Sequence, residues 1–229
     1  MITLTNVTKK YSSKKALDNV NLELTVGKLI GLVGENGSGK STTLKLIAGL
    51  KHPTKGEVRV NGELVTRRIA DSVSYLSELD EYYSFFTVEK TIEFYASQFK
   101  DFDLDKAYEI LKFMKLDPKS KPKHLSKGNR GRLKIVLSLA RNVPVILLDE
   151  PFSGLDPMVR NSIVKGLISF IDLEKQLVLI TTHEIREVES ILDEVVAIKD
   201  GSIIGHHNVE DLREEKQIGI VDWMEEIYG

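Results

Sequence analysis

The stretch Gly34-Glu35-Asn36-Gly37-Ser38-Gly39-Lys40-Ser41 decides the fold of this chain. It matches the pattern G-x-x-x-x-G-K-[ST] at every fixed position. A short apolar strand, Leu29 to Val33, precedes it, and apolar residues at helical spacing follow it from Ser41 to Leu50. A strand, a glycine-rich turn and a helix in this order are typical of a loop that binds nucleotide phosphates, and a chance glycine loop rarely fits every position.

Each residue type in this loop has a physical role in binding phosphate. Gly37 and Gly39 allow a tight turn in which successive backbone N–H groups face one oxyanion. The helix that starts near Lys40 adds its positive N-terminal end, and Lys40 itself reaches the β- and γ-phosphates. The Ser41 hydroxyl is expected to coordinate Mg²⁺. We therefore predict that ATP and Mg²⁺ bind at Gly34, Asn36, Gly37, Ser38, Gly39, Lys40, Ser41 and Thr42.

A second signal is the apolar strand Val145 to Leu148, which ends in Asp149 and Glu150. Two acids at the end of a buried strand are unusual, because unpaired buried carboxylates are costly. At the carboxyl edge of a parallel sheet they would lie beside the phosphate loop. We predict that Asp149 holds the Mg²⁺ and that Glu150 orients or deprotonates the attacking water. The alternative is that they only cap the next element.

The order of the expected elements indicates an α/β fold. Strands and helices alternate around the phosphate loop and again after residue 143, which predicts a parallel sheet covered by helices. A helical block from about 87 to 141 would be an insertion into that sheet. The expected strands are 2–4, 20–24, 29–33, 58–60, 145–148, 177–181 and 195–199, and the expected helices are 41–50, 87–100, 104–115, 129–141, 159–172 and 185–193.

Composition limits the classes of function. The chain has 229 residues, 41% of them hydrophobic, which suffices for one packed domain. Its formal net charge of −2 favours neither nucleic acid nor a membrane surface, and the absence of cysteine excludes disulfides and thiolate zinc sites. The start of the chain does not resemble a secretory signal, and the densest apolar run, Val143 to Leu148, is too short to span a bilayer. We expect a soluble, cytoplasmic protein.

Further motifs give the sequence a family resemblance. Leu125-Ser126-Lys127-Gly128-Asn129 lies ahead of Asp149, Ser153-Gly154-Leu155-Asp156 follows Glu150, and His183 lies in Thr181-Thr182-His183-Glu184. With the phosphate loop, these motifs resemble the nucleotide-binding domain of ABC transporters over essentially the whole chain. The resemblance implies a P-loop NTPase core with a mainly parallel sheet, an antiparallel β-subdomain and an inserted helical subdomain. It places the core in about 1–83 and 143–208, the helical subdomain in about 84–142 and a tail in 209–229.

The resemblance also implies roles for single residues. Tyr11 would stack on adenine, and His183 would contact the γ-phosphate. Ser126 and Gly128 of the signature motif, with Asp156, would complete the nucleotide site. These roles follow from the family and not from spacing alone.

Two motifs depart from the family pattern, at three positions in all. The usual signature is Leu-Ser-Gly-Gly-Gln, but Lys127 replaces the first glycine and Asn129 the glutamine. This form looks like the bacterial exporters of drugs and antimicrobial peptides. Glu78 stands where the family has a glutamine that touches Mg²⁺, and a carboxylate could ligate that ion as well.

The family pattern predicts the partners. The signature of one subunit closes over the nucleotide held by the other, so we expect a homodimer or a heterodimer with a second ATPase subunit. We also expect a multi-span transmembrane permease as a partner, with this chain peripheral on the inner face of the cell membrane. The expected outcome is transport, with export as the favoured direction. Aromatic residues are enriched at interfaces, so Tyr82, Tyr83, Phe85 and Phe86 are candidates for that contact, whereas Phe94, Tyr95, Phe99 and Phe102 are expected in the core.

Rival functions come from a basic run. It comprises Lys115, Lys119, Lys121, Lys123, Lys127, Arg130, Arg132 and Lys134, opposed by Asp117, and such a run could bind nucleic acid. Superfamily members that act on DNA or ribosomes usually carry long coiled coils or two fused ATPase units, and this chain is too short for either. We therefore expect no nucleic acid. A non-transport ATPase that regulates a membrane sensor stays open as an alternative.

Overall fold

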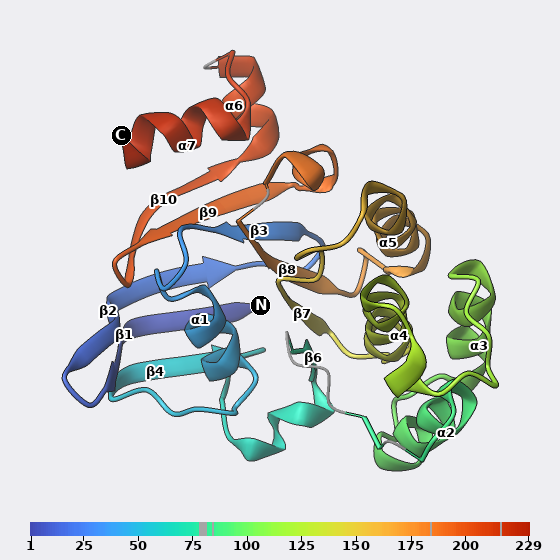
Figure 1. The fold of residues 1–229 in the computed structure, drawn as a ribbon. Coiled ribbons are helices and arrows are strands. Elements are labelled where there is room, and N and C mark those ends of the chain that lie inside the picture. Colours follow the sequence, from blue (N-terminus) through green and yellow to red (C-terminus); the bar gives the residue numbers. More distant parts are fainter. Residues whose placement is uncertain (78–81, 84, 184, 216) are drawn as a thin grey trace.

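A six-stranded sheet forms the centre of the fold (Figure 1). The computed structural model describes residues 1–229 except 78–81, 84, 184 and 216. The strand order is β10-β9-β3-β8-β7-β6, and all neighbours are parallel except β10, which is antiparallel to β9. Its strands are β3 (Leu29–Val33), β6 (Val73–Leu76), β7 (Val145–Asp149), β8 (Leu177–Thr182), β9 (Glu194–Lys199) and β10 (Ser202–Asn208).

A second, antiparallel sheet has the order β2-β1-β4-β5. Its strands are β1 (Ile2–Tyr11), β2 (Lys14–Leu24), β4 (Lys55–Val60) and β5 (Glu63–Leu64). Asn61 and Gly62 form the turn between the antiparallel strands β4 and β5. Both the parallel sheet and the antiparallel subdomain predicted from the sequence are confirmed.

The helices fall into two groups. Helix α1 (Lys40–Ile47) follows the phosphate loop and lies on the side of the antiparallel sheet, whereas α2 (Val88–Gln98), α3 (Leu104–Phe113), α4 (Lys127–Leu139) and α5 (Pro157–Phe170) lie together beyond β7 and β6 (Figure 1). Thr87 caps α2, since its hydroxyl accepts the N–H of Lys90 at 3.2 Å. Short 3-10 helices occupy Arg67–Asp71 and Pro122–His124.

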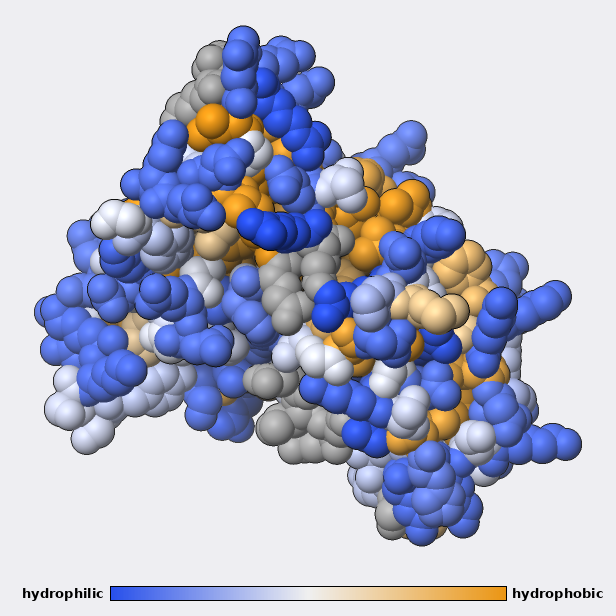
Figure 2. Space-filling view, turned by 45° about the horizontal axis from the view of Figure 1, so that its top comes forward, coloured by the Kyte–Doolittle hydropathy of each residue, from blue (hydrophilic) through white to orange (hydrophobic). Residues whose placement is uncertain are grey.

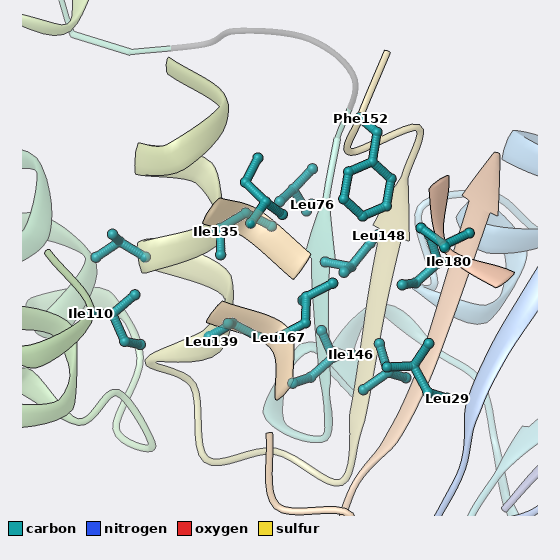
Figure 3. Packing of buried hydrophobic residues seen from close by; sticks show 14 of the residues in the cluster. Leu29, Leu76, Ile110, Ile135, Leu139, Ile146, Leu148, Phe152, Leu167 and Ile180 are labelled. Atoms are coloured by element: carbon teal, nitrogen blue, oxygen red, sulfur yellow. The ribbon is translucent and has the colours of Figure 1, made fainter. Parts of the chain in front are cut away.

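The two faces of the six-stranded sheet pack into two hydrophobic clusters, because successive side chains of a strand point to opposite faces. Ile146 and Leu148 of β7 pack with residues of the helical group, including Ile135 of α4 (Figure 3). Val145 and Leu147 of the same strand pack with α1 and the antiparallel sheet. The sheet therefore connects the phosphate loop on one face to the helical subdomain on the other.

The segment after His183 differs from the prediction. The helix expected over 185–193 is wrong: two short 3-10 helices, Ile185–Glu187 and Glu189–Ile191, stand in its place. Residues three apart lie on the same side of a 3-10 turn, so Ile185 and Val188 are still buried. Hydrogen bonds to the rest of the fold, including one from the N–H of Leu29 to the Asp193 carboxylate at 2.7 Å, hold this segment in its irregular course.

Several further elements were not predicted in detail. Strands β6 and β10 were missed, and the tail contains α6 (Val209–Glu215) and α7 (Ile220–Tyr228), which pack on the end of the sheet formed by β9 and β10 (Figure 1). Of the aromatic residues expected in the core, only Phe102 is buried, and Phe94, Tyr95 and Phe99 are half-buried.

Over the described part of the chain, no helix has the length and apolar character needed to cross a membrane.

Candidate functional site

Three segments with polar residues meet where the parallel strands end. The phosphate loop follows β3, Asp149 and Glu150 lie at the end of β7, and His183 follows β8. Because these strands are neighbours and parallel, their carboxyl ends share one edge of the sheet. A cavity of about 580 Å³ opens there, lined by Tyr11, Lys14, Ala16, Asn36, Gly37, Gly39, Lys40, Ser41, Thr42, Glu150, Ser153 and His183.

The phosphate loop has the backbone that its glycines permit. Gly37 and Gly39 have φ angles of 85° and 119°, a region that side chains rarely allow. A Cβ atom at Gly39 would also lie 2.7 Å from the carbonyl oxygen of Ala16, so a larger residue does not fit. The loop leads directly into α1, whose N-terminus has no side-chain cap among the described residues and carries the positive end of the helix dipole.

Lys40 is buried in this loop, with 5% of its surface exposed. Its ammonium group donates to the carbonyl oxygens of Gly34 at 2.7 Å and Glu35 at 3.1 Å, and it lies 3.5 Å from Glu150 Oε1. Ser38 Oγ is buried and has no hydrogen-bond partner among the described residues. A buried ammonium and an unsatisfied hydroxyl suit a multiply charged anion, because phosphate oxygens accept from both.

Asp149 is 1% exposed and accepts three hydrogen bonds. Ser41 Oγ donates at 2.8 Å and Thr181 Oγ1 at 2.9 Å to its Oδ1 atom, and Tyr75 Oη donates at 2.9 Å to Oδ2. This arrangement brings together the hydroxyl and carboxylate predicted to hold Mg²⁺. Two oxygen ligands from the protein suit Mg²⁺, because this ion takes its other ligands from substrate phosphates and water.

Glu150 faces both Lys40 and His183. His183 Nδ1 lies 2.8 Å from Glu150 Oε2, and the Glu150 N–H donates to Thr181 Oγ1 at 2.9 Å. The backbone of Glu150 is left-handed, with φ of 48°, which is unfavourable for a glutamate and is typical of residues held for function. The strained turn directs a carboxylate at the lysine and histidine across the cavity.

Tyr11 lies at the rim of the same cavity and is 41% exposed. The ammonium group of Lys9 lies 5.1 Å from the centre of its ring. An exposed ring beside the phosphate loop offers a flat surface to a nucleotide base.

The structure does not bring Ser126, Gly128 and Asp156 to this cavity. Ser126 caps α4, accepting the N–H of Asn129 at 3.2 Å, and Asp156 caps α5, accepting N–H groups from the first turn at 3.0 Å. A Cβ atom at Gly128 would lie 2.8 Å from Val159 Cγ2. The contact between α4 and α5 therefore leaves no room for a side chain at this position. Glu78, the third predicted metal ligand, lies outside the described residues.

Sequence reasoning missed residues that shape the site. Thr181 joins Asp149 to the backbone of Glu150, and Tyr75 donates to Asp149 from the neighbouring strand β6. Lys14 and Ala16 line the cavity from β2. The threonine pair before His183 was a usable signal, because a polar residue at the end of an apolar strand needs a partner. Lys14 and Ala16 gave no comparable signal.

Comparison with known proteins identifies the family. The family described as ABC transporter matches residues 17–153. An uncharacterized ABC transporter ATP-binding protein of Methanocaldococcus jannaschii is 32% identical over 92% of this chain and 79% of its own length. A Nod factor export ATP-binding protein of Burkholderia orbicola is 34% identical over 86% of this chain and 67% of its own length.

Solved structures agree with that assignment. A dimeric ATP-binding cassette in a post-hydrolysis state, bound to ADP and Pi, has a TM-score of 0.81 and 27% identity, covering 91% of this chain and 98% of that one. The ATP-binding subunit of an ABC transporter has a TM-score of 0.87 over 100% of both chains at 23% identity, which shows the shared fold. The phosphate loop, the paired acids and these relatives together establish that the chain belongs to the ABC transporter family, as an ATP-binding subunit with ATPase activity.

Proposed function

We propose that this subunit powers transport across a membrane, with ATP and Mg²⁺ bound at the cavity after β3, β7 and β8. The contact of Glu150 with both Lys40 and His183 carries the proposal, because it puts a base opposite a phosphate-binding ammonium group. The chain would act as one ABC ATPase unit, with residues 1–83 and 143–208 as the core, 84–142 as the helical subdomain and 209–229 as the tail.

Each side chain has a defined task in this proposal. The loop N–H groups and Lys40 bind the β- and γ-phosphates, and Tyr11 stacks on the base. Ser41 and Asp149 would hold the Mg²⁺, which neutralises charge on the phosphate oxygens. Glu150 accepts the proton of the attacking water, and His183 orients Glu150 and the γ-phosphate. The hydrogen bonds from Ser41, Thr181 and Tyr75 keep the Asp149 carboxylate oriented.

The position of α4 supports a dimer. Its N-terminus, with Ser126 and Gly128, does not line the cavity of its own chain, yet Ser126 is exposed and its helix can offer N–H groups to an anion. We propose that a second subunit, identical or related, presents this N-terminus to the γ-phosphate. The dimeric form of the relative bound to ADP and Pi supports this arrangement.

The membrane partner would dock beside the helical subdomain. A cavity of about 590 Å³ lies between the sheet and α2, lined by residues that include Leu50, Tyr82, Phe94, Tyr95 and Phe99. Beside it, Tyr83 and Phe85 are 52% and 68% exposed, and the Tyr83 ring packs edge-on against Phe94. Exposed aromatic side chains around an apolar groove suit an inserted segment of another protein, here a cytoplasmic helix of a permease.

The direction of transport belongs to the proposal. Relatives include the Nod factor exporter and an aliphatic sulfonates import ATP-binding protein of Bacillus cereus, 32% identical over 86% of this chain and 82% of its own length. We favour export because Lys127 in the signature resembles the drug and antimicrobial-peptide exporters. The chain would then lie on the cytoplasmic face of the cell membrane.

A role in binding nucleic acid is less well supported. The last cations of the basic run bond to the protein itself: Arg130 donates to the carbonyl oxygen of Leu125 at 2.6 Å, Arg132 to Ser162 Oγ at 3.1 Å and Lys134 to the carbonyl oxygen of Ser77 at 3.1 Å. Side chains held this way are poor phosphate contacts along a duplex.

Affinity purification from membranes in mild detergent tests the proposal. We expect a multi-span protein to co-purify with the native chain and to be lost from Phe85→Glu, because a charge at this exposed ring opposes docking. Glu109→Gln, an exposed change on α3, is the matched control. Recovery of nucleic acid or a single-span sensor instead of a multi-span protein would contradict transport.

A further inference from the structure

Helix α7 lies beyond the match to the family, which ends at residue 153, and none of its residues lines the cavity in front of α1. It is anchored firmly: Trp223 is 1% exposed and meets the His207 ring edge-on at 5.2 Å. The space around Gly205 is filled by the same indole, since a Cβ atom there would lie 2.5 Å from Trp223 Cζ2. The helix is therefore a fixed part of the β9 and β10 end of the sheet (Figure 1).

The last turn of α7 reaches the start of the phosphate loop. Tyr228 Oη donates to the carbonyl oxygen of Ile198 at 2.8 Å and lies 3.3 Å from that of Val33, the residue before Gly34. A Cβ atom at Gly34 would lie 3.0 Å from the same hydroxyl. Lys199 donates to the Tyr228 carbonyl oxygen at 3.2 Å, which holds the end of the helix in place.

The Tyr228 hydroxyl stays a donor under all ordinary conditions. Burial raises the pKa of Tyr228 to about 12, and the negative charge of Glu35 adds in the same direction, although the hydrogen bond to Ile198 opposes them. At neutral pH the Tyr228 hydroxyl therefore keeps the proton that it donates to the backbone carbonyls of Ile198 and Val33.

Helix α7 also touches the segment that follows His183. The Ile220 N–H donates to Glu189 Oε1 at 2.9 Å. A cavity of about 520 Å³ has mainly apolar walls from α7, including Tyr228, from the His183 segment and from Glu35 of the phosphate loop. Figure 2, in which the end that carries α6 and α7 is turned toward the viewer, shows hydrophobic patches within a mainly hydrophilic surface. Among the described residues of α7, Tyr228 is the one whose side chain hydrogen-bonds to the residue before the phosphate loop, Val33.

We propose that Tyr228 is a positioning residue for the phosphate loop. By holding the backbone at Val33 and Ile198, its hydroxyl keeps the loop in the shape that directs its N–H groups at phosphate. A site ordered before the ligand arrives binds more tightly, because less ordering is needed on binding. The loop grips the phosphates common to ATP and ADP, so the effect extends to both nucleotides. The chemical step at Glu150 does not depend on it.

Calorimetric titration of Tyr228→Phe with ATP and with ADP tests this role. We expect both affinities to fall by about three- to tenfold, the range for one hydrogen bond, while kcat stays within about twofold and KM for ATP rises in parallel. Tyr108→Phe on α3, far from the loop, is the matched control and leaves both affinities unchanged.

Two outcomes would overturn the proposal. If Tyr228→Phe lowered the thermal midpoint but left both affinities intact, the hydroxyl would only fasten α7 to the sheet. If the loss appeared in kcat alone, with ADP bound normally, the residue would act through the His183 segment instead. Circular dichroism of each variant shows whether the fold is retained.

Discussion

The N-termini of α1 and α4 are the two candidate phosphate-binding helix ends of this chain, and they are built differently. Helix α1 begins inside a glycine loop, with Lys40 buried at 5% exposure and a cavity of about 580 Å³ in front of it. Helix α4 begins at the exposed Ser126, whose hydroxyl caps its own helix, and none of its first residues lines that cavity.

Under the proposed dimer, this difference means that one chain holds a half-site, which comprises the groups around α1. The residues proposed to bind the phosphates and to activate water lie around α1, at the carboxyl edge of the parallel sheet. The α4 end does not line the cavity in front of α1, and in the proposed dimer it acts on a nucleotide held by another chain. The ATPase activity of the family and the dimeric relative are consistent with this division.

The largest effect is expected from the base on the α1 side. Glu150→Gln keeps the size and hydrogen bonding of the side chain but removes the proton acceptor. We expect kcat to fall by about 10²- to 10⁴-fold with ATP still bound, and a dimer to accumulate because bound ATP is not consumed. Steady-state turnover and gel filtration with ATP measure both. A variant with normal turnover would remove Glu150 from its assigned role.

The α4 side is tested by Ser126→Arg. A bulky cation at the helix end blocks its approach to a nucleotide of the other chain, so we expect turnover to fall by about 10²- to 10³-fold. Binding of ATP to the single chain is expected to stay within about twofold. Ser97→Arg, at an exposed position of α2, controls for the added charge. Undiminished turnover of Ser126→Arg would mean that α4 takes no part in the site.

Lys40→Ala tests ATP binding at the α1 end, apart from the catalytic step. Removing a buried ammonium that pairs with phosphate is expected to weaken ATP binding by at least about 30-fold. Calorimetry measures the affinity directly. The opposite result, normal affinity, would show that the phosphates bind elsewhere.

The smallest effect concerns stability, at the other end of the sheet from both helix ends. Burial alone raises the pKa of Glu194, but hydrogen bonds from Lys28 and His206 outweigh it and lower the pKa below its usual 4.5. This ion pair therefore stabilises the fold above about pH 4.5 and is lost as the pH falls through the lower folded value. Glu194→Gln is expected to cost about 1 kcal/mol at pH 7.

Denaturant unfolding at pH 7 and pH 3.5 measures that cost. The difference between Glu194→Gln and the native chain is expected to shrink at the lower pH, and ATP affinity is expected to be the same in both. A cost that grew on acidification would contradict the assigned direction of the pKa.

The sequence predicted the half-site around α1 better than the surroundings of that half-site. Fixed spacing located Lys40, Ser41 and Glu150, because a phosphate loop and acids at a strand end depend on local backbone geometry. Thr181 and Tyr75 were missed, since their contacts with Asp149 form only when β6, β7 and β8 lie side by side.

The segment after His183 shows a second limit. Its apolar spacing predicted one helix, yet packing against β3 and α7 produced two 3-10 turns that bury the same residues. Periodicity reports which side chains are buried and not which backbone buries them. The packing of Trp223, which anchors α7, could likewise not be predicted from the sequence. An amphipathic pattern in the tail does not indicate which strand its apolar face packs against.

A mixture of two inactive variants tests the shared site most directly. Lys40→Ala keeps the α4 end intact, and Ser126→Arg keeps the α1 end intact, so each mixed dimer contains one complete site. Equal amounts give half mixed dimers, and we predict that the mixture recovers roughly a quarter of native ATPase activity. A mixture no more active than the two variants alone would contradict a site built from one chain's phosphate loop and the α4 end of a second copy.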